Sequence, residues 1–214
     1  MNYSKSLAFL CELWYYYCMN SVLKNFRPFQ YSESIKILEQ ASNIIAPNTK
    51  NMYMVIGANG AGKSTLIANM YAKGKFSCPY INADIMKRRC PEKSDSEAMF
   101  DTMETVTGAL KKGQSFVYES VFSHPSKLDF LKQAKEMGYK VHVFFVSTDN
   151  PQINVRRVAK RVQEGGHNVP PQKIVDRYYR TLALAKQAIA FCDDYYLIDN
   201  SKERSRGFSM NNEQ

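Results

Sequence analysis

The chain has 214 residues, enough for one domain with a small appendage, and its 44% hydrophobic and 23% charged residues form an ordinary globular mixture that can build a core. The net charge of +9 favours anionic partners, such as nucleotides, sugar phosphates, nucleic acids or an acidic protein, without choosing among them. The five cysteines are scattered, and none forms a Cys-x-x-Cys pair, which argues against a disulfide or zinc framework and for free thiols in a reducing cytoplasm.

The first stretch that could act in targeting is residues 7–18. It is too short to span a membrane, Glu12 lies in its middle, and it lacks the small-residue cleavage site of a signal peptide. No other run of the chain is long enough to cross a bilayer. We therefore expect a cytoplasmic protein without a membrane partner.

Residues 1–50 precede the first clear strand and are expected to form an N-terminal helical extension. A packed helix is predicted over 32–46, because its apolar residues fall at helical spacing: Ile35, Leu38, Ala41 and Ile45. This extension has three possible explanations: a helical appendage, a partner-binding site, or an artefact of start-site choice, since Met19 and Met52 could also begin the protein. No function is assigned to residues 1–30.

Residues 52–65 carry the most informative pattern in the chain. An apolar run over 52–56 predicts a buried strand, and it is followed by a glycine, four residues and then Gly-Lys-Ser, the spacing of a P-loop. Glycines let the backbone turn tightly and bring its N–H groups close to an anion, and the helix that begins there points its positive end at the phosphates. Lys63 would reach the β- and γ-phosphates of ATP, and the Ser64 hydroxyl would hold Mg²⁺. The nucleotide-binding residues predicted in this way are Gly57, Ala58, Asn59, Gly60, Ala61, Gly62, Lys63, Ser64 and Thr65.

Helices and strands then alternate along the chain. Helices are predicted over 64–73, 94–112, 125–137, 151–164 and 172–191, and strands over 80–82, 116–118, 141–146 and 195–198. Alternation without hairpin signals predicts an α/β fold, a P-loop NTPase with a mainly parallel sheet of about five strands and helices on both faces. We assign residues 51–201 to this domain and 202–214 to a polar tail.

Ligands of such sheets gather beyond the carboxyl ends of the strands, where two acidic residues stand. Asp84 could take a proton from a hydroxyl that attacks the γ-phosphate, or it could equally be a helix N-cap. Glu119, followed by Ser120, could serve the metal or the acceptor substrate, or be a turn residue.

Two arginine-bearing helices flank the sequence Gly165-Gly166-His167 and suggest a lid over about 156–180. Its arginines include Arg157 and Arg161, which share a helix face, and Arg177 and Arg180 on the next helix. Closing such a lid would bring guanidinium groups onto a transferring phosphoryl group and exclude water. For any single arginine the alternative is a solvated helix face.

At this level of detail the chain resembles the zeta-toxin family of P-loop kinases, from about Met52 to Asn200. The lid segment is the most specific part, because P-loops are widespread. The similar segments are the P-loop, Asn82-Ala83-Asp84, Phe116 to Ser120, Arg161-Val-Gln-Glu-Gly-Gly-His-Asn-Val-Pro-Pro with Arg177-Tyr-Tyr-Arg180, and Tyr196 to Ser201.

The resemblance implies ATP- and Mg²⁺-dependent phosphorylation of a nucleotide sugar, with UDP-N-acetylglucosamine as the leading acceptor. It implies that Asp84 is the catalytic base and that Lys63, Arg161 and Arg177 act on the phosphates, with Arg157 and Arg180 as close competitors. Acceptor binding would fall to Asp84, Glu119 and Ser120, although a Thr is common at position 120 in the family. A toxin of this kind would also have a neutralising antitoxin as its partner.

Other functions stay open. The acceptor could be another nucleotide sugar, an antibiotic or a polynucleotide end, and a nucleotide-binding module without chemistry is the alternative of a different class. Nucleic acid is not expected as a partner, because the tyrosine-rich stretches match no nucleic-acid-binding motif. The chain also lacks an Asn-Lys-x-Asp motif, which argues against a GTPase switch.

Overall fold

A computed structural model describes residues 29–30 and 49–202 of the chain. Its centre is a six-stranded sheet in the order β1-β6-β5-β2-β4-β3, and every neighbouring pair of strands is parallel. The strands are β1 (Phe29–Gln30), β2 (Asn51–Ile56), β3 (Tyr80–Ile81), β4 (Phe116–Ser120), β5 (Lys140–Ser147) and β6 (Asp194–Asp199).

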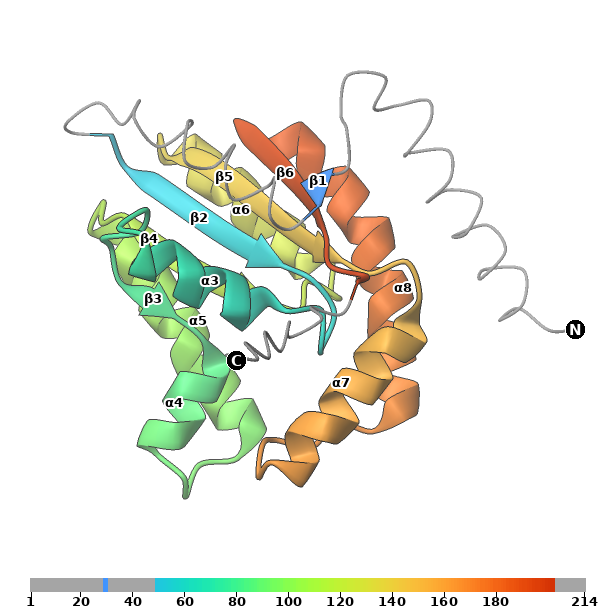
Figure 1. Cartoon of the computed structure of the whole chain (residues 1–214). Helices are drawn as coiled ribbons and strands as arrows, with labels where there is room; N and C mark the ends of the chain where they lie inside the picture. Colours follow the sequence, from blue (N-terminus) through green and yellow to red (C-terminus); the bar gives the residue numbers. More distant parts are fainter. Residues whose placement is uncertain (1–28, 31–48, 203–214) are drawn as a thin grey trace, which may run out of the picture.

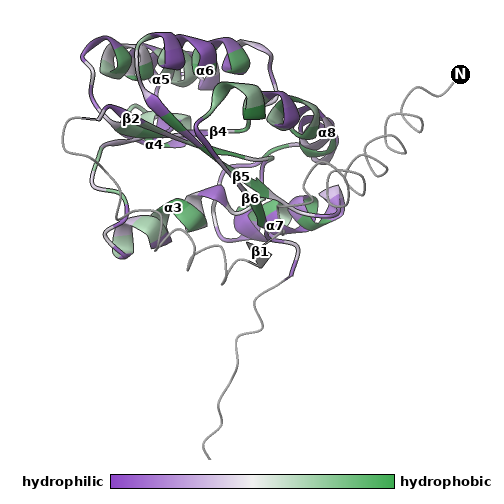
Figure 2. Ribbon diagram, turned by 90° about the horizontal axis from the view of Figure 1, so that it is seen from above, coloured by the Kyte–Doolittle hydropathy of each residue, from purple (hydrophilic) through white to green (hydrophobic). Residues whose placement is uncertain are grey.

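Helices cover both faces of this sheet (Figures 1 and 2). They are α3 (Lys63–Ala72), α4 (Ala83–Arg89), α5 (Asp95–Lys111), α6 (Ser126–Glu136), α7 (Pro151–Gln163) and α8 (Pro171–Ala188), which a short 3₁₀ turn over Ile189–Phe191 follows. Seen from above, α5, α6 and α8 lie on one side of the sheet, and α3 and α7 lie on the other (Figure 2).

The central strand β2 shows how the sequence builds two cores. Its six residues are all buried, which a strand covered by helices on both faces requires. Side chains alternate along a strand, so Met52, Met54 and Ile56 join the core under α5, α6 and α8, whereas Tyr53 and Val55 join the core under α3. The strand thus fixes the P-loop, which follows it directly, between two packed layers.

The predicted fold class is confirmed, with differences in two short elements. The α4 helix was not predicted as separate, because its seven residues are polar or basic at most positions and none is buried, so they carry no apolar periodicity. The β1 strand was not predicted either, because two residues give no pattern, and it lies in the segment expected to be helical. The helix expected over 32–46 and the tail from 203 fall outside the described residues.

Within the described part of the chain, no helix combines the length and the apolar character that crossing a membrane requires.

Candidate active site

Two positions of the P-loop accept only glycine. Gly60 has φ +78° and Gly62 has φ +104°, a left-handed region that side chains disfavour. A Cβ on Gly60 would lie 2.5 Å from the carbonyl oxygen of Asn154, and a Cβ on Gly62 would collide with the Asn200 side chain. Asn154 and Asn200 therefore pack directly against the loop backbone at these glycines. This geometry suits close approach of the backbone to an anion such as a phosphate.

Lys63 and Ser64 begin α3 and meet the acid at the end of β4. The Lys63 ammonium is buried, donates a hydrogen bond to the Ala58 carbonyl oxygen at 3.2 Å and lies 3.7 Å from Glu119 Oε1. The Ser64 hydroxyl lies 3.1 Å from both carboxylate oxygens of Glu119. Because β2 and β4 are adjacent, with Ile56 opposite Ser120, their carboxyl ends bring these groups together.

The charges of nearby residues affect the pKa of Lys63. Burial lowers the pKa of the Lys63 ammonium, whereas the negative charges of Glu119 and Asp84 raise that pKa and the positive charge of Arg161 lowers it. Asp84 of α4 and Arg161 of α7 are thus among the charges that affect the pKa of this lysine. That these side chains serve one site stays a prediction.

Asp84 lies in the first turn of α4 rather than capping the helix. The cap is Asn82, whose Oδ1 accepts hydrogen bonds from the N–H groups of Asp84 at 2.6 Å and Ile85 at 3.3 Å. The Asp84 side chain is exposed, so its carboxylate is not used to hold the helix end. The alternative that Asp84 is an N-cap is therefore wrong.

The four arginines of the predicted lid have different surroundings. Arg177 Nη1 donates to Asn59 Oδ1 in the P-loop at 3.0 Å, and burial lowers the pKa of its guanidinium. Arg161 Nη2 donates to the His167 carbonyl oxygen at 2.8 Å, and its Nε is buried without a hydrogen-bond partner within residues 49–202. Arg157 Nη2 donates to the Asn200 carbonyl oxygen at 2.8 Å, and Arg180 is exposed. Of these three hydrogen bonds, the one from Arg177 is made to a P-loop residue.

Two asparagines to which sequence reasoning gave no role in the site, Asn154 and the strand-end residue Asn200, donate hydrogen bonds to the P-loop. Asn154 of α7 is fully buried and donates to the Asn59 carbonyl oxygen at 3.0 Å, while Thr148 donates to its Oδ1 at 2.5 Å. Asn200, just after β6, donates to the Ala61 carbonyl oxygen at 2.7 Å. No local pattern marks Asn154, because it sits within a helix that otherwise looks basic and amphipathic.

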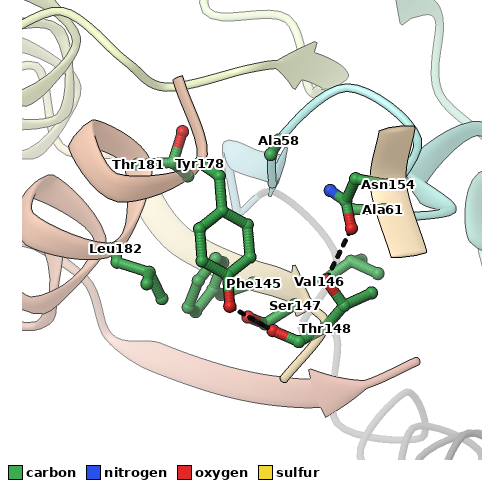
Figure 3. Close-up of a pocket in the computed structure, with 10 residues that line it drawn as sticks. All are labelled: Ala58, Ala61, Phe145, Val146, Ser147, Thr148, Asn154, Tyr178, Thr181 and Leu182. Carbon is green, nitrogen blue, oxygen red and sulfur yellow. Dashed lines mark hydrogen bonds between the residues drawn. The ribbon is translucent and has the colours of Figure 1, made fainter. Parts of the chain in front are cut away.

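The crevice in Figure 3 lies behind the P-loop and away from these charges. It is bounded by Ala58 and Ala61, the end of β5, Asn154 and Tyr178, and neither Lys63 nor Asp84 lines it. The Tyr178 hydroxyl donates to the Thr148 carbonyl oxygen at 2.5 Å across it. We read it as a packed seam that joins the P-loop to α7 and α8, not as a substrate site.

Glu119 and Ser120 end β4 with different contacts. Glu119 faces Ser64 and Lys63, the side where phosphates and a metal would lie. Ser120 is buried, and its Oγ accepts a hydrogen bond from the N–H of Phe122 at 3.1 Å. Phe122 has φ +59°, an uncommon conformation for a bulky residue, so the chain leaves β4 through a strained turn beside the site.

The donor set at Ser64 suits a hard divalent cation. The hydroxyl of Ser64 and the carboxylate of Glu119 are oxygen ligands, which Mg²⁺ prefers, and they already lie together. The described residues hold no group of three His, Cys, Asp or Glu side chains that could bind a metal by itself. A cation here would therefore depend on the phosphates for further ligands, as Mg²⁺ does in nucleotide sites.

A family model and several known proteins are similar to this chain. The model of the family described as Zeta toxin matches residues 36–204. A protein of Haemophilus influenzae (strain ATCC 51907 / DSM 11121 / KW20 / Rd), described as uncharacterized, is 32% identical over 124 residues, which cover 57% of this chain and 88% of that protein. A solved chain of the PezAT chromosomal toxin-antitoxin system of Streptococcus pneumoniae is 16% identical with a TM-score of 0.56, over 80% of this chain and 79% of that one.

A chain in the crystal structure of AvrRxo1-ORF1:-ORF2 with ATP is also similar. Its TM-score is 0.53 at 18% identity, over 73% of this chain, which spans just 58% of that one. Identities this low show a shared fold alone. The family model, in contrast, matches most of the chain and includes the P-loop, α4 and both helices of the predicted lid. The chain belongs to the zeta-toxin family of P-loop kinases.

Proposed function

We propose that this protein transfers the γ-phosphate of ATP to a hydroxyl group of a nucleotide sugar, with UDP-N-acetylglucosamine as the leading acceptor. The observation that carries the proposal is a geometric one: the buried P-loop lysine, Lys63, lies 3.7 Å from Glu119, and Arg177 of α8 donates a hydrogen bond to the P-loop at Asn59. Asp84, in the first turn of α4, follows β3, the strand that pairs with β4. Phosphoryl transfer needs a base, a lid cation and a phosphate-binding lysine in one place.

Asp84 supplies the proton acceptor in this proposal. Its exposed carboxylate takes the proton of the acceptor hydroxyl as the hydroxyl oxygen bonds to the γ-phosphorus. The bond from that phosphorus to the β–γ bridging oxygen breaks, and ADP leaves with the electron pair. The products are the phosphorylated acceptor, ADP and a proton that Asp84 then releases to water.

Cationic side chains stabilise the charge that this transfer spreads over the phosphoryl oxygens. Lys63 is in the P-loop, and Arg177 already reaches this loop through Asn59. Arg161 has a buried Nε without a hydrogen-bond partner in the described residues, a donor that an anionic group would satisfy. In a site that excludes water, such preorganised donors contribute strongly to the rate.

Ser64 and Glu119 would hold Mg²⁺ beside the phosphates. When bound, Mg²⁺ neutralises phosphate charge as it builds up. We assign Glu119 to this side because it contacts Ser64 and Lys63, while its role in acceptor binding, shared with Ser120 and Asp84, rests on the family resemblance.

An antitoxin is the proposed protein partner. The support is that the PezAT structure is named as a toxin-antitoxin system, and that a net charge of +9 suits an acidic partner.

The experiment that tests the function is incubation of the purified protein with labelled ATP, Mg²⁺ and a panel of nucleotide sugars, with free sugars, an aminoglycoside and a 5′-hydroxyl RNA as alternatives. Mass spectrometry should find one phosphate added to UDP-N-acetylglucosamine. Transfer to another member of the panel would replace the acceptor but keep the kinase. Tight ATP binding without transfer to any of them would favour the non-catalytic module.

A coupled pair of variants tests the contact between the P-loop and α8. Asn59→Ala removes the oxygen that accepts from Arg177 and should lower kcat about tenfold, the usual effect of losing a hydrogen bond to a charged group. If Asn59 acts by orienting Arg177, then adding Asn59→Ala to Arg177→Ala should cause no further loss. Additive losses in steady-state assays would show that the two residues act independently.

A further inference from the structure

A chain of hydrogen bonds links the P-loop to the start of α4. The Ser64 hydroxyl donates to Glu119, and the Tyr80 hydroxyl donates to Oε2 of the same carboxylate. Asn82 Nδ2 donates to the Tyr80 oxygen at 3.1 Å, and Asn82 Oδ1 accepts from the N–H of Asp84. One phenol therefore connects the metal side of the site to the helix that carries the proposed base.

Tyr80 is suited to donate rather than to ionise. It is the first residue of β3, the edge strand that pairs with β4, and its side chain is half-buried. The hydroxyl donates to the Glu119 carboxylate while its oxygen accepts from Asn82, and a hydrogen bond to a carboxylate is one of the stronger kinds in proteins.

The hydrogen bond from Tyr80 determines which neighbouring side chains the Glu119 carboxylate contacts. Glu119 Oε1 lies 3.7 Å from the Lys63 ammonium, beyond hydrogen-bond distance. A carboxylate released from Tyr80 could move onto Lys63 and neutralise the charge that the phosphates need, and it would also leave Ser64. Because Tyr80 holds Glu119 Oε2, the Lys63 ammonium stays available to the phosphates, and the oxygens of Ser64 and Glu119 stay together as cation ligands.

We propose that Tyr80 is a positioning residue that holds the Glu119 carboxylate at Ser64 for a divalent cation and, through Asn82, fixes the start of the helix bearing Asp84. This inference rests on the proposed phosphoryl transfer for its effect on rate. Its effect on the cation is measurable by binding alone.

The test is Tyr80→Phe, and the chain offers a matched control in Tyr71→Phe. Tyr71 is a neighbour on α3, with its ring centroid 6.4 Å from that of Tyr80, and its hydroxyl donates to the Cys78 carbonyl oxygen at 2.5 Å. Each variant removes one hydrogen-bonded hydroxyl and keeps the ring, but the Tyr71 hydroxyl donates to a backbone carbonyl group and the Tyr80 hydroxyl donates to Glu119. Melting temperature and circular dichroism check that both variants fold.

The first readout is binding of a non-hydrolysable ATP analogue by calorimetry across a Mg²⁺ titration. Tyr80→Phe should raise the Mg²⁺ concentration for half-maximal tightening about five- to tenfold and leave the metal-free affinity near that of wild type. Tyr71→Phe should leave both unchanged. In the Glu119→Gln background, Tyr80→Phe should cause no further shift of the Mg²⁺ midpoint, because Tyr80 acts through that carboxylate.

Equal Mg²⁺ midpoints for Tyr80→Phe and Tyr71→Phe would overturn the inference, as would an undiminished shift in the Glu119→Gln background. Failure of the proposed function looks different: the wild type would phosphorylate no acceptor, while the Mg²⁺ titration would still rank the two tyrosine variants. If Tyr80→Phe does not fold, Asn82→Asp provides the second measurement. That carboxylate would compete with Glu119 for the Tyr80 hydroxyl, so a shift of the Mg²⁺ midpoint relative to wild type supports the inference and an unchanged midpoint contradicts it.

Discussion

Replacing Asp84 with Asn should lower the turnover number about 10²- to 10⁴-fold, the range that general-base catalysis usually contributes. The amide has nearly the same shape but cannot accept the proton of the acceptor hydroxyl. Affinity for ATP should stay close to that of wild type, because Asn82 caps α4 independently of the Asp84 side chain. Lys63 also keeps Glu119, the charge that raises its pKa most. Steady-state kinetics and calorimetry measure the two effects separately.

Asp129→Asn is the control for that variant. Asp129 is also an exposed aspartate in the first turn of a helix, α6, so its replacement removes a similar interaction with the helix dipole away from the P-loop. It should leave turnover unchanged.

The same pair tests toxicity: expression of the wild type without a partner should arrest bacterial growth, Asp129→Asn should do the same, and Asp84→Asn should not. Unchanged turnover in Asp84→Asn would exclude this carboxylate as the base.

Replacing Lys63 with Met should weaken ATP binding about 10- to 100-fold and lower kcat about 10²- to 10³-fold. The first figure follows from the loss of one charge-assisted hydrogen bond to phosphate, and the second from the loss of a preorganised cation in the transition state. Met has a similar length and no charge. Lys63 is 6% exposed, so the apolar replacement removes a desolvated charge, and the fall in melting temperature should be small because Glu119 keeps its hydrogen bonds to Ser64 and Tyr80.

The melting temperature of Lys63→Met distinguishes weak ATP binding from loss of folding. In this variant Glu119 loses its contact with Lys63 but keeps its hydrogen bonds to Ser64 and Tyr80, so its carboxylate still has hydrogen-bond partners. Lys135→Met on α6 is the matched control, since Lys135 pairs with Asp193 and its side chain is 40% exposed. That control should bind ATP normally. Weak binding by Lys63→Met together with a large drop in melting temperature would mean that Lys63 holds the loop together rather than the nucleotide.

The Asp84 and Lys63 variants together distinguish a kinase from a nucleotide-binding module. A kinase loses turnover in both and loses ATP affinity mainly in Lys63→Met. A binding module has no turnover to lose, so its two variants would differ in affinity alone.

Local patterns predicted most of the fold because each one depends on neighbouring residues. The apolar run before Gly57 and the spacing of Gly60, Gly62 and Lys63 mark a buried strand and a P-loop at short range. Alternating helices and strands imply a parallel sheet, and a parallel sheet gathers its strand ends at one edge. The positions of Asp84 and Glu119 near that edge followed from this, although their roles remain predictions.

What the sequence could not predict is which partner each side chain takes. Asn154 and Asn200 bind P-loop carbonyl groups across 95 and 139 residues of chain, and Tyr80 reaches Glu119 across 39. The sequence did not predict the α4 helix, because none of its seven residues is buried and they show no apolar periodicity. The Asn82 cap sets the start of this helix.

The sequence by itself determined the P-loop, the parallel α/β fold and the family, because short-range spacing and alternation fix the backbone's local shape and the order of its elements. The tertiary structure alone decided that Glu119 faces Ser64, that Arg177 donates to Asn59 of the P-loop while Arg161 donates to the His167 carbonyl oxygen, and that Tyr80 links Glu119 to the start of α4 through Asn82. These pairings depend on the register between distant strands and on how α7 and α8 pack, and neither is written in any local stretch of residues.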